Sequence, residues 1–324
     1  MTLGYLTSER GVPVDTPVAA VPPPRLRLYA FGSRPPFGAY LRQLWQMRYF
    51  IWLLGISKGE NLPDDDKNST FWNIAEPVMH AARFILIFGL VLYGHQEVNP
   101  IAFVVVGIFT WDFFESCIMS NFRVIKGNKN IIASYSFPRA IVVIGAVLAS
   151  AFKYRYDLLI MLICVAASGL IPGMLPMLPT LRWFAAIPAF LLIIIWGIGA
   201  ACIAARIGTF LPQIRSFLTL PMIFLRVSSG VMFSAALFVP MVGQRTIDYI
   251  ALLPGAVFVY LMRSSLLQDP LFPPSVEMWL LGIAWSIATF VFGLAIFWFG
   301  EHEYGKKARL LVDDSLHKTL ETLA

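Results

Sequence analysis

The chain has 324 residues, of which 58% are hydrophobic and only 14% charged, whereas soluble domains are usually about 45–50% apolar and about 25% charged. This composition excludes an ordinary soluble protein, and several apolar runs approach the roughly 20 residues that a helix needs to cross a bilayer. Basic cytoplasmic loops explain the net charge of +6 more simply than nucleic acid does. The sequence predicts an all-α integral membrane protein with no nucleic-acid partner.

The N-terminal 70 residues divide into two predicted parts. Residues 1–35 contain Pro22–Pro24 and no apolar core, so we expect a disordered cytoplasmic tail rather than a signal peptide. Within residues 36–70, the stretch Phe37–Ile56 gathers its polar side chains in one narrow arc at 100° per residue. This indicates an amphipathic helix in the cytoplasmic interface, with a buried spanning helix as the alternative. The polar loop Gly59–Thr70 follows.

Residues 71–300 are predicted to hold six transmembrane helices. Their approximate ranges are Phe71–Tyr93, Ile101–Asn121, Pro138–Leu170, Trp183–Ala205, Ser216–Pro240 and Val276–Phe299. Before the last of them, the apolar piece Ile250–Met262 is too short to span and predicts an outer re-entrant or interfacial hairpin. Residues 301–324 form a second predicted cytoplasmic tail.

The distribution of basic residues orients these helices. The predicted cytoplasmic pieces hold eighteen Lys and Arg residues, and the outer loop before the last span holds two, Arg245 and Arg263. Basic residues accumulate on the cytoplasmic side of membrane proteins. We therefore expect both termini inside, in the cytoplasmic membrane of a bacterium.

The stretch Gly107–Ala140 organises this topology. It leaves the second span, passes through a basic and amide-rich segment, and re-enters the membrane at Phe137-Pro138-Arg139. Pro138 suits the first turn of a helix, where a missing N–H costs nothing. A short helical element held between two membrane helices on the cytoplasmic side is a suitable handle for a soluble partner.

Signatures of ATP-hydrolysing and zinc-dependent enzymes are missing from the sequence. It contains no GxxxxGK[ST] motif and no HExxH motif. The three cysteines lie in apolar segments without metal-ligand spacing, so we expect neither a metal site nor a disulfide. Active transport would draw its energy from a partner subunit or an ion gradient.

Charged residues inside the predicted spans need a polar cavity or a partner. They are Arg83, Lys153, Arg155, Asp157 and Arg226. For Lys153 and Asp157 we expect an i,i+4 pair. Arg226 lies deep in the fifth span, where it would either donate hydrogen bonds to sugar hydroxyls or phosphate in a translocation path or pair with a neighbouring helix. Aromatic side chains on the second and fifth spans would suit a sugar-conducting tunnel or ordinary packing.

The pattern resembles the membrane subunit of ABC type-2 polysaccharide exporters, which export O-antigen, teichoic acid and galactan. The resemblance covers about Tyr40 to Lys307. It is carried by YLRQLWQMRYFIWLLG, by W-x4-P at Trp72 and Pro77, by GIFTWDFFE, GNKNII and FPRA in order, by LLPGAVFVYLMRSSLL, and by AWSIATFVFGLAIFWFGEHEYG.

The resemblance implies a homodimeric permease with two copies of a cytoplasmic ATPase subunit. A polyprenyl-pyrophosphate-linked glycan would pass between the two permeases among membrane lipids, and ATP and Mg would bind the partner rather than this chain. The implied ATPase-coupling residues are Val124, Lys126, Asn128, Lys129, Asn130, Arg139, Arg42 and Arg48. The channel-lining candidates are Trp111, Phe114, Phe217, Phe224 and Arg226, and the outer-gate candidates are Phe258, Tyr260 and Arg263.

Three other functions stay open. An ABC type-2 exporter of lipids or drugs would have a narrow tunnel lined only by aliphatic side chains. An integral-membrane enzyme on polyprenyl-linked sugars would need an acidic or histidine cluster, which the sequence does not reveal. An ion-coupled carrier would show inverted repeats with broken helices, and no such repeat is evident.

Overall fold

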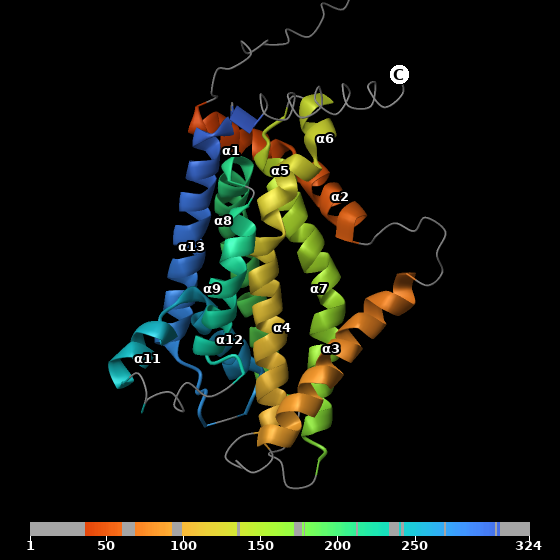
Figure 1. The fold of residues 1–324 in the computed structure, drawn as a ribbon, viewed down its shortest axis with the longest axis vertical. Coiled ribbons are helices and arrows are strands. Elements are labelled where there is room, and N and C mark those ends of the chain that lie inside the picture. Colours follow the sequence, from red (N-terminus) through yellow and green to blue (C-terminus); the bar gives the residue numbers. More distant parts are fainter. Residues whose placement is uncertain are drawn as a thin grey trace, which may run out of the picture. The chain divides into compact units, whose positions relative to one another are not determined.

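The computed structural model describes residues 36–59, 69–92, 99–134, 137–171, 177, 179–211, 213–232, 240, 243–268, 270–301 and 303–304. All of them belong to the unit Arg34–Ala324, and its regular elements are helices (Figure 1). The predicted tail of residues 1–35 lies outside the described residues. So do Asp64–Asp66 of the polar loop and most of the predicted C-terminal tail.

The helices follow the predicted order. The long ones are α3 (Ser69–Leu92), α4 (Pro100–Met119), α7 (Ala140–Ser168), α8 (Ala186–Phe210), α9 (Ile214–Ser228) and α13 (Val276–Phe299). The short ones are α1 (Phe37–Gln46), α2 (Arg48–Gly59), η1 (Asn121–Arg123), α5 (Val124–Gly127), α6 (Lys129–Ser134), η2 (Leu181–Ala185), α11 (Gln244–Ala251) and α12 (Pro254–Leu266). Within the fifth predicted span, α9 ends at Ser228, before Gly230, whose φ of 71° is no longer helical; residues 233–239 of that span lie outside the described residues.

Three helical stretches of the described chain are long and apolar enough to cross a membrane: Pro100–Gly127, Leu181–Phe210 and Val276–Phe299. A fourth is obtained if α11 and α12, which meet at an angle of 79°, are counted as one broken span. α3 and α7 have 24 and 29 residues, which is sufficient length, but charged side chains interrupt their apolar runs. The chain is therefore an all-α membrane protein.

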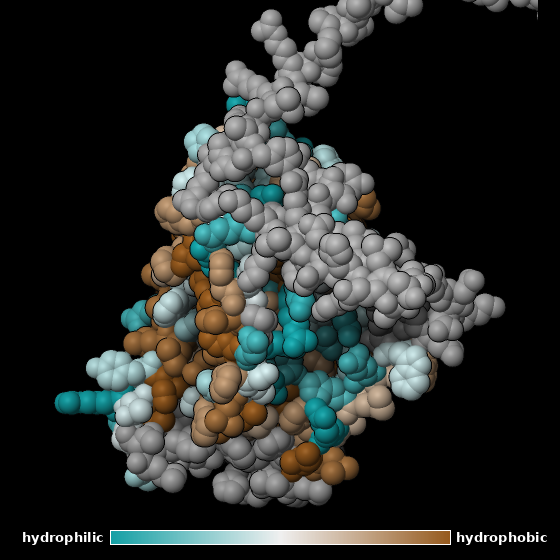
Figure 2. All heavy atoms as spheres, turned by 45° about the horizontal axis from the view of Figure 1, so that its top comes forward, coloured by the Kyte–Doolittle hydropathy of each residue, from teal (hydrophilic) through white to brown (hydrophobic). Residues whose placement is uncertain are grey.

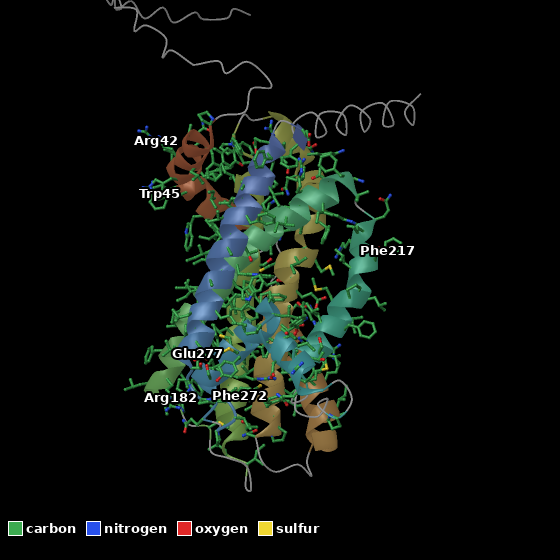
Figure 3. The ribbon with its side chains drawn as sticks, turned by 90° about the vertical axis from the view of Figure 1, so that its left-hand side faces the viewer. Arg42, Trp45, Arg182, Phe217, Phe272 and Glu277 are labelled. Carbon is green, nitrogen blue, oxygen red and sulfur yellow. The ribbon has the colours of Figure 1, made fainter. Side chains whose placement is uncertain are left out.

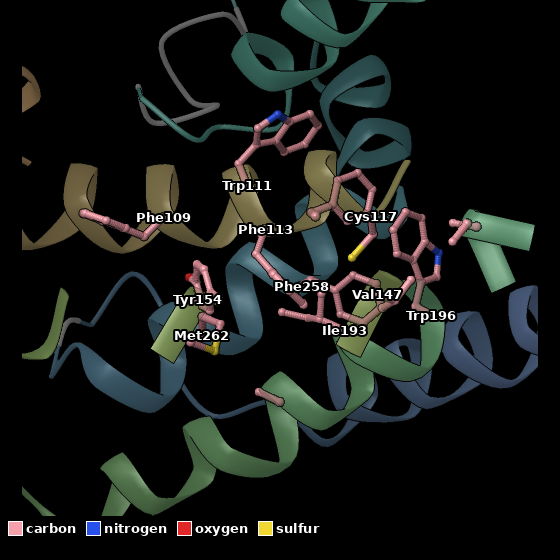
Figure 4. Close-up of a cluster of buried hydrophobic side chains, with 14 of the residues drawn as sticks. Phe109, Trp111, Phe113, Cys117, Val147, Tyr154, Ile193, Trp196, Phe258 and Met262 are labelled. Carbon is pink, nitrogen blue, oxygen red and sulfur yellow. The ribbon is translucent and has the colours of Figure 1, made fainter. Parts of the chain in front are cut away.

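α4 forms the centre of the bundle because it is apolar on all sides. It packs against α3, α7, α8 and α12, and Trp111, Phe113 and Cys117 are at most 2% exposed. Figure 4 shows these side chains facing Trp196 of α8 and Phe258 of α12. The aromatic residues of the second span are thus mainly packing residues.

Glycines set the closest contacts between helices. A Cβ atom at Gly199 of α8 would lie 2.1 Å from the carbonyl oxygen of Thr289 in α13, and one at Gly293 would lie 2.1 Å from the carbonyl oxygen of Gly199. The backbones of α8 and α13 therefore touch, as small residues allow in membrane helix pairs.

The predicted amphipathic helix Phe37–Ile56 is divided at Met47 into α1 and α2. The two halves are held by different partners, which explains the break. α1 is fixed through Tyr40 to Glu301 beyond α13, whereas α2 packs along α7 where Gly145 faces Leu54. Figure 3 shows Arg42 and Trp45 of α1 at one end of the bundle, and Arg182, Phe272 and Glu277 toward the other.

Candidate functional site

Polar residues at helical spacing meet in one cavity inside the bundle. α3 contributes Glu76, His80 and Arg83, α4 contributes Asp112 and Ser116, and α7 contributes Ser150, Lys153 and Asp157. Within each helix these positions are three, four or seven residues apart, so their side chains lie on one face. Figure 2 shows hydrophilic side chains beside hydrophobic surface on the face formed by these helices.

The cavity has a volume of about 490 Å³ and is also lined by Phe109, Phe113, Tyr154 and Arg226. Its walls thus combine carboxylates, cations, hydroxyl groups and aromatic rings. The side chains of Glu76 and Lys153 are 68% and 53% exposed at its margin. Charges on membrane helices face protein or a water-filled space, so the cavity has the composition of an aqueous compartment rather than of a lipid contact.

Arg226 of α9 is the centre of the strongest interaction in the cavity. Its Nη2 donates to Asp112 Oδ1 at 2.6 Å and to Glu115 Oε2 at 2.8 Å. Trp111 Nε1 donates to the same Glu115 oxygen at 2.9 Å. Charge-assisted hydrogen bonds of this kind are short and strong. Of the two alternatives that the sequence left for Arg226, the structure shows pairing with a neighbouring helix.

α3 is joined to α4 and α7 by two further pairs. His80 Nδ1 lies 3.5 Å from Asp112 Oδ2, and Lys153 Nζ lies 3.2 Å from Glu76 Oε2. The predicted i,i+4 pair of Lys153 and Asp157 is therefore wrong, because a carboxylate from another helix takes the ammonium group. Arg155 points elsewhere, and its guanidinium lies over the ring of Tyr156.

The channel-lining candidates fall into two groups. Trp111 and Phe114 are buried in the core, where the Phe114 ring stacks on Trp196 with 4.1 Å between centroids. Phe217 and Phe224 are 76% and 68% exposed on α9, and Figure 3 shows Phe217 pointing outward from that helix. Only Arg226, of the five candidates, lines the charged cavity.

Two of the three outer-gate candidates, Tyr260 and Arg263, line a smaller cavity of about 190 Å³ between the end of α9 and the α11–α12 pair. Arg263 is 3% exposed and donates to the carbonyl oxygens of Phe103, Gly230 and Val231. It thereby satisfies carbonyl groups that the end of α9 leaves open. Phe258 is buried, and the Tyr260 hydroxyl donates to the Pro273 carbonyl oxygen at 2.6 Å.

At the opposite end, the coupling candidates cluster on short helices. Lys126 and Asn130 are exposed, as are Arg42 and Arg48 on α1 and α2, whereas Lys129 is half-buried and Val124 is buried. Asn128 accepts a hydrogen bond from Lys58 of α2, and burial lowers the pKa of Lys58. The α5–α6 segment is thus attached to the N-terminal helices.

Arg139 belongs to a buried cluster at the same end. Its backbone N–H donates to Glu301 Oε1 at 2.9 Å, its Nη1 donates to the same oxygen at 3.1 Å, and the Tyr40 hydroxyl donates to Glu301 Oε2 at 3.0 Å. Burial raises the pKa of Glu301 despite the neighbouring guanidinium, and burial also raises the pKa of Tyr40. This cluster joins α1, the start of α7 and the end of α13.

The chain matches no protein-family model. It is similar to two curated proteins of Klebsiella pneumoniae, both named O-antigen export system permease protein RfbA. The identities are 24% and 23%, in each case over 184 residues that make up 56% of this chain and 68% of the relative. This similarity supports the resemblance to polysaccharide export permeases that the sequence motifs indicate.

The cavity is lined by residues that the sequence analysis did not single out, Glu76, His80 and Asp112, and Glu115 pairs with Arg226 beside it. Two signals were present in the sequence. Glu76, His80 and Arg83 have the spacing of one helix face, and Asp112 and Glu115 stand three apart inside an apolar run. In the described residues no three His, Cys, Asp or Glu side chains are placed to hold a metal ion.

Proposed function

We propose that this chain is the membrane-spanning subunit of an ATP-driven exporter. Its cargo would be a polyprenyl-pyrophosphate-linked polysaccharide of the O-antigen, galactan or teichoic-acid type, carried across the cytoplasmic membrane of a bacterium. One observation carries the proposal: a chain similar to O-antigen export permeases has a charged, hydroxyl-bearing cavity between its helices. A hydrated glycan needs such a lining, because sugar hydroxyls both donate and accept hydrogen bonds.

The proposed topology has six spans with both termini in the cytoplasm. The spans are α3, α4, α7, α8, α13 and a fifth that begins with α9. α1 and α2 are the interface helix, α5 and α6 are the coupling element, and α11 and α12 are the outer hairpin. The sharp bend between α11 and α12 supports the last assignment.

ATP hydrolysis is assigned to a separate subunit, present in two copies, because this chain carries no phosphate-binding loop. The exposed Lys126, Asn130, Arg42 and Arg48 give this end a basic surface for docking. The hydrogen bond from Lys58 to Asn128 would let one docked subunit move the interface helix and the coupling element together. In this proposal the chain is not an enzyme and binds no cofactor itself.

A second copy of the chain is proposed to cover the open side of the cavity. Glu76 and Lys153 are more than half exposed there, and charged groups on a membrane helix are costly against lipid. A channel between two copies would place these charges against water and glycan. The outward-facing aromatic side chains Phe217 and Phe224 would then face the partner or the glycan.

The alternative functions differ in the side chains that they require in the cavity lining. A lipid or drug exporter is disfavoured, because the lining is charged rather than aliphatic. An enzyme on polyprenyl-linked sugars is the second candidate, since His80 lies beside Asp112 in a cluster that the sequence did not reveal. The enzyme hypothesis predicts that the purified chain converts a polyprenyl-linked sugar in the absence of nucleotide.

The decisive experiment combines depletion with affinity purification. Depleting the protein should remove a polysaccharide from the cell surface and leave its lipid-linked form inside. The tagged protein, solubilised from native membranes, should bring down an ATPase subunit whose hydrolysis is measurable. A protein that purifies alone, with surface glycans intact after depletion, would overturn the proposal.

A further inference from the structure

The charges in the cavity are already paired with one another. Arg226 is neutralised by two carboxylates, Asp112 at 2.6 Å and Glu115 at 2.8 Å. Lys153 is neutralised by Glu76 at 3.2 Å. Two of the three cations at the cavity are therefore engaged by carboxylates of the same chain, and an incoming anion would have to compete with these contacts.

Acidic groups outnumber basic ones at this site. Three acids line the cavity, Glu76, Asp112 and Asp157, against three bases, Arg83, Lys153 and Arg226. Glu115, which is bonded to Arg226 at 2.8 Å but does not line the cavity, adds a fourth carboxylate, so the cluster carries a balance of −1 with His80 neutral. Like charges repel more strongly in a membrane-enclosed cavity than in bulk water. Phosphate or carboxylate groups repeated along a polymer would meet this repulsion at every repeat.

The remaining lining suits an uncharged polyhydroxyl chain. Asp157 adds a further carboxylate acceptor at the cavity, Ser116 and Ser150 add hydroxyl groups, and Phe109 and Phe113 supply ring faces. Carboxylate oxygens accept hydrogen bonds from hydroxyl groups, and aromatic rings offer apolar surface to the C–H faces of sugars.

We infer that the cavity selects polysaccharides whose repeating units carry no charge, and disfavours phosphodiester-linked or uronate-containing chains. This inference rests on the proposed function and narrows its substrate class. It concerns the repeats of the chain and not the pyrophosphate of the lipid carrier.

Two measurements test it. In the first, the lipid-linked glycan that accumulates on depletion is purified and analysed for phosphate and uronic acid. The inference expects neither in the repeat. A charged repeat would overturn it while leaving the exporter function intact, whereas no accumulated glycan at all would overturn the exporter function itself.

In the second, a charge is added to the cavity wall at Ser150, a half-buried position on α7. Ser150→Asp adds a negative charge, Ser150→Lys adds a positive one, and Ser150→Asn controls for size. An uncharged glycan should be exported by the Asp and Asn variants within about twofold of each other, whereas an anionic chain should lose about tenfold or more with Asp and recover with Lys. That second pattern would overturn the inference.

Membrane abundance of each variant is measured beside export, so that loss of protein is separated from loss of transport. Ser116 of α4, which also lines the cavity, provides a second position for the same comparison among Asp, Lys and Asn. A sign-dependent effect at both positions contradicts an uncharged substrate, and insensitivity to sign at both supports it.

Discussion

Individual side chains determine the charge and the hydrogen bonding of the inner cavity. The sequence left two partners open for Arg226, a substrate or a neighbouring helix. Its guanidinium pairs with Asp112 and Glu115, because α9 passes α4 at that level. Glu301 shows the same principle at the α1 end of the bundle, where one carboxylate accepts three hydrogen bonds from two parts of the chain, two from Arg139 and one from Tyr40. In both places a charge is acceptable because other residues supply its counter-charge and hydrogen bonds.

Arg226→Met should destabilise the protein and stop export. It would leave two carboxylates without their cation, which costs about 3–5 kcal/mol in a fully buried pair. Here about 1–3 kcal/mol is expected, because the three side chains are 20–27% exposed and partly screened. Thermal unfolding in detergent measures the change, and the exposed Arg182→Met serves as the control. Adding Asp112→Asn and Glu115→Gln should restore part of the stability; equal loss in single and triple variants would contradict the pairing.

The Glu301 cluster predicts a pH dependence of stability. The pKa of Glu301 is raised above its ordinary value of 4.5 by burial, so the folded protein holds this proton more tightly than the unfolded chain. Stability from this group is complete below about pH 4.5 and declines as the pH rises through the raised pKa. Melting temperatures between about pH 4 and 7 should fall more for the natural protein than for Glu301→Gln. Parallel curves would contradict the assignment.

At the scale of elements, the short helices α1, α2, α5 and α6 are attached to the long ones, or to one another, by specific contacts. α2 reaches the α5–α6 segment through Lys58 and Asn128, and α1 reaches α7 and α13 through the Tyr40–Glu301 contact. Force applied to this end would therefore be passed to α7, one of the long helices that line the cavity.

Reversing the charges of the α5–α6 segment should uncouple transport. Lys126→Glu with Lys129→Glu is expected to reduce export by at least about tenfold, because like charges placed at a docking surface cost several kcal/mol. Membrane insertion should stay normal. The matched control is Arg182→Glu with Arg245→Glu, two exposed cations of the described residues outside this segment. Normal export by the first double variant would remove the coupling assignment.

The close contact between α8 and α13 predicts that one methyl group added at Gly199 clearly lowers the stability of the protein. Gly199→Ala would place a Cβ 2.1 Å from the Thr289 carbonyl oxygen, and such overpacking typically costs about 1–3 kcal/mol. Gly38→Ala on α1, where a Cβ meets nothing within 4 Å, should leave the stability unchanged or slightly raised. Comparable melting temperatures for both variants would show that α8 and α13 can separate freely.

For the whole molecule, the open side of the cavity implies a larger assembly. A single copy of 36.2 kDa leaves charged side chains of α3 and α7 exposed at membrane helices. Light scattering of the purified protein should give the mass of two chains. A cysteine at Val78, exposed on α3 near the cavity, should cross-link two copies, whereas one at Leu280, which is also exposed but lies on α13, should not. Cross-linking at Leu280 alone would place the partner on another face.

The sequence by itself determined the class of the protein and most of its elements. Apolar runs of membrane length, the position of Pro138 and the bias of Lys and Arg are local signals, and helices form from local hydrogen bonds. α13 accordingly begins and ends at the predicted residues. The hairpin region also shows a local signal, since Pro254 opens α12 after a break.

Only the tertiary structure decided which charges meet. Glu76 and Lys153 are 77 residues apart and Arg226 and Asp112 are 114 apart, so their pairing depends on how whole helices pack. Local spacing favoured Lys153 with Asp157, yet an ion pair between neighbours on one helix is weak, at about 0.2–0.5 kcal/mol. Packing brings α3 against α7 and α9 against α4, and the choice of partner, with the cavity that results, follows from that contact.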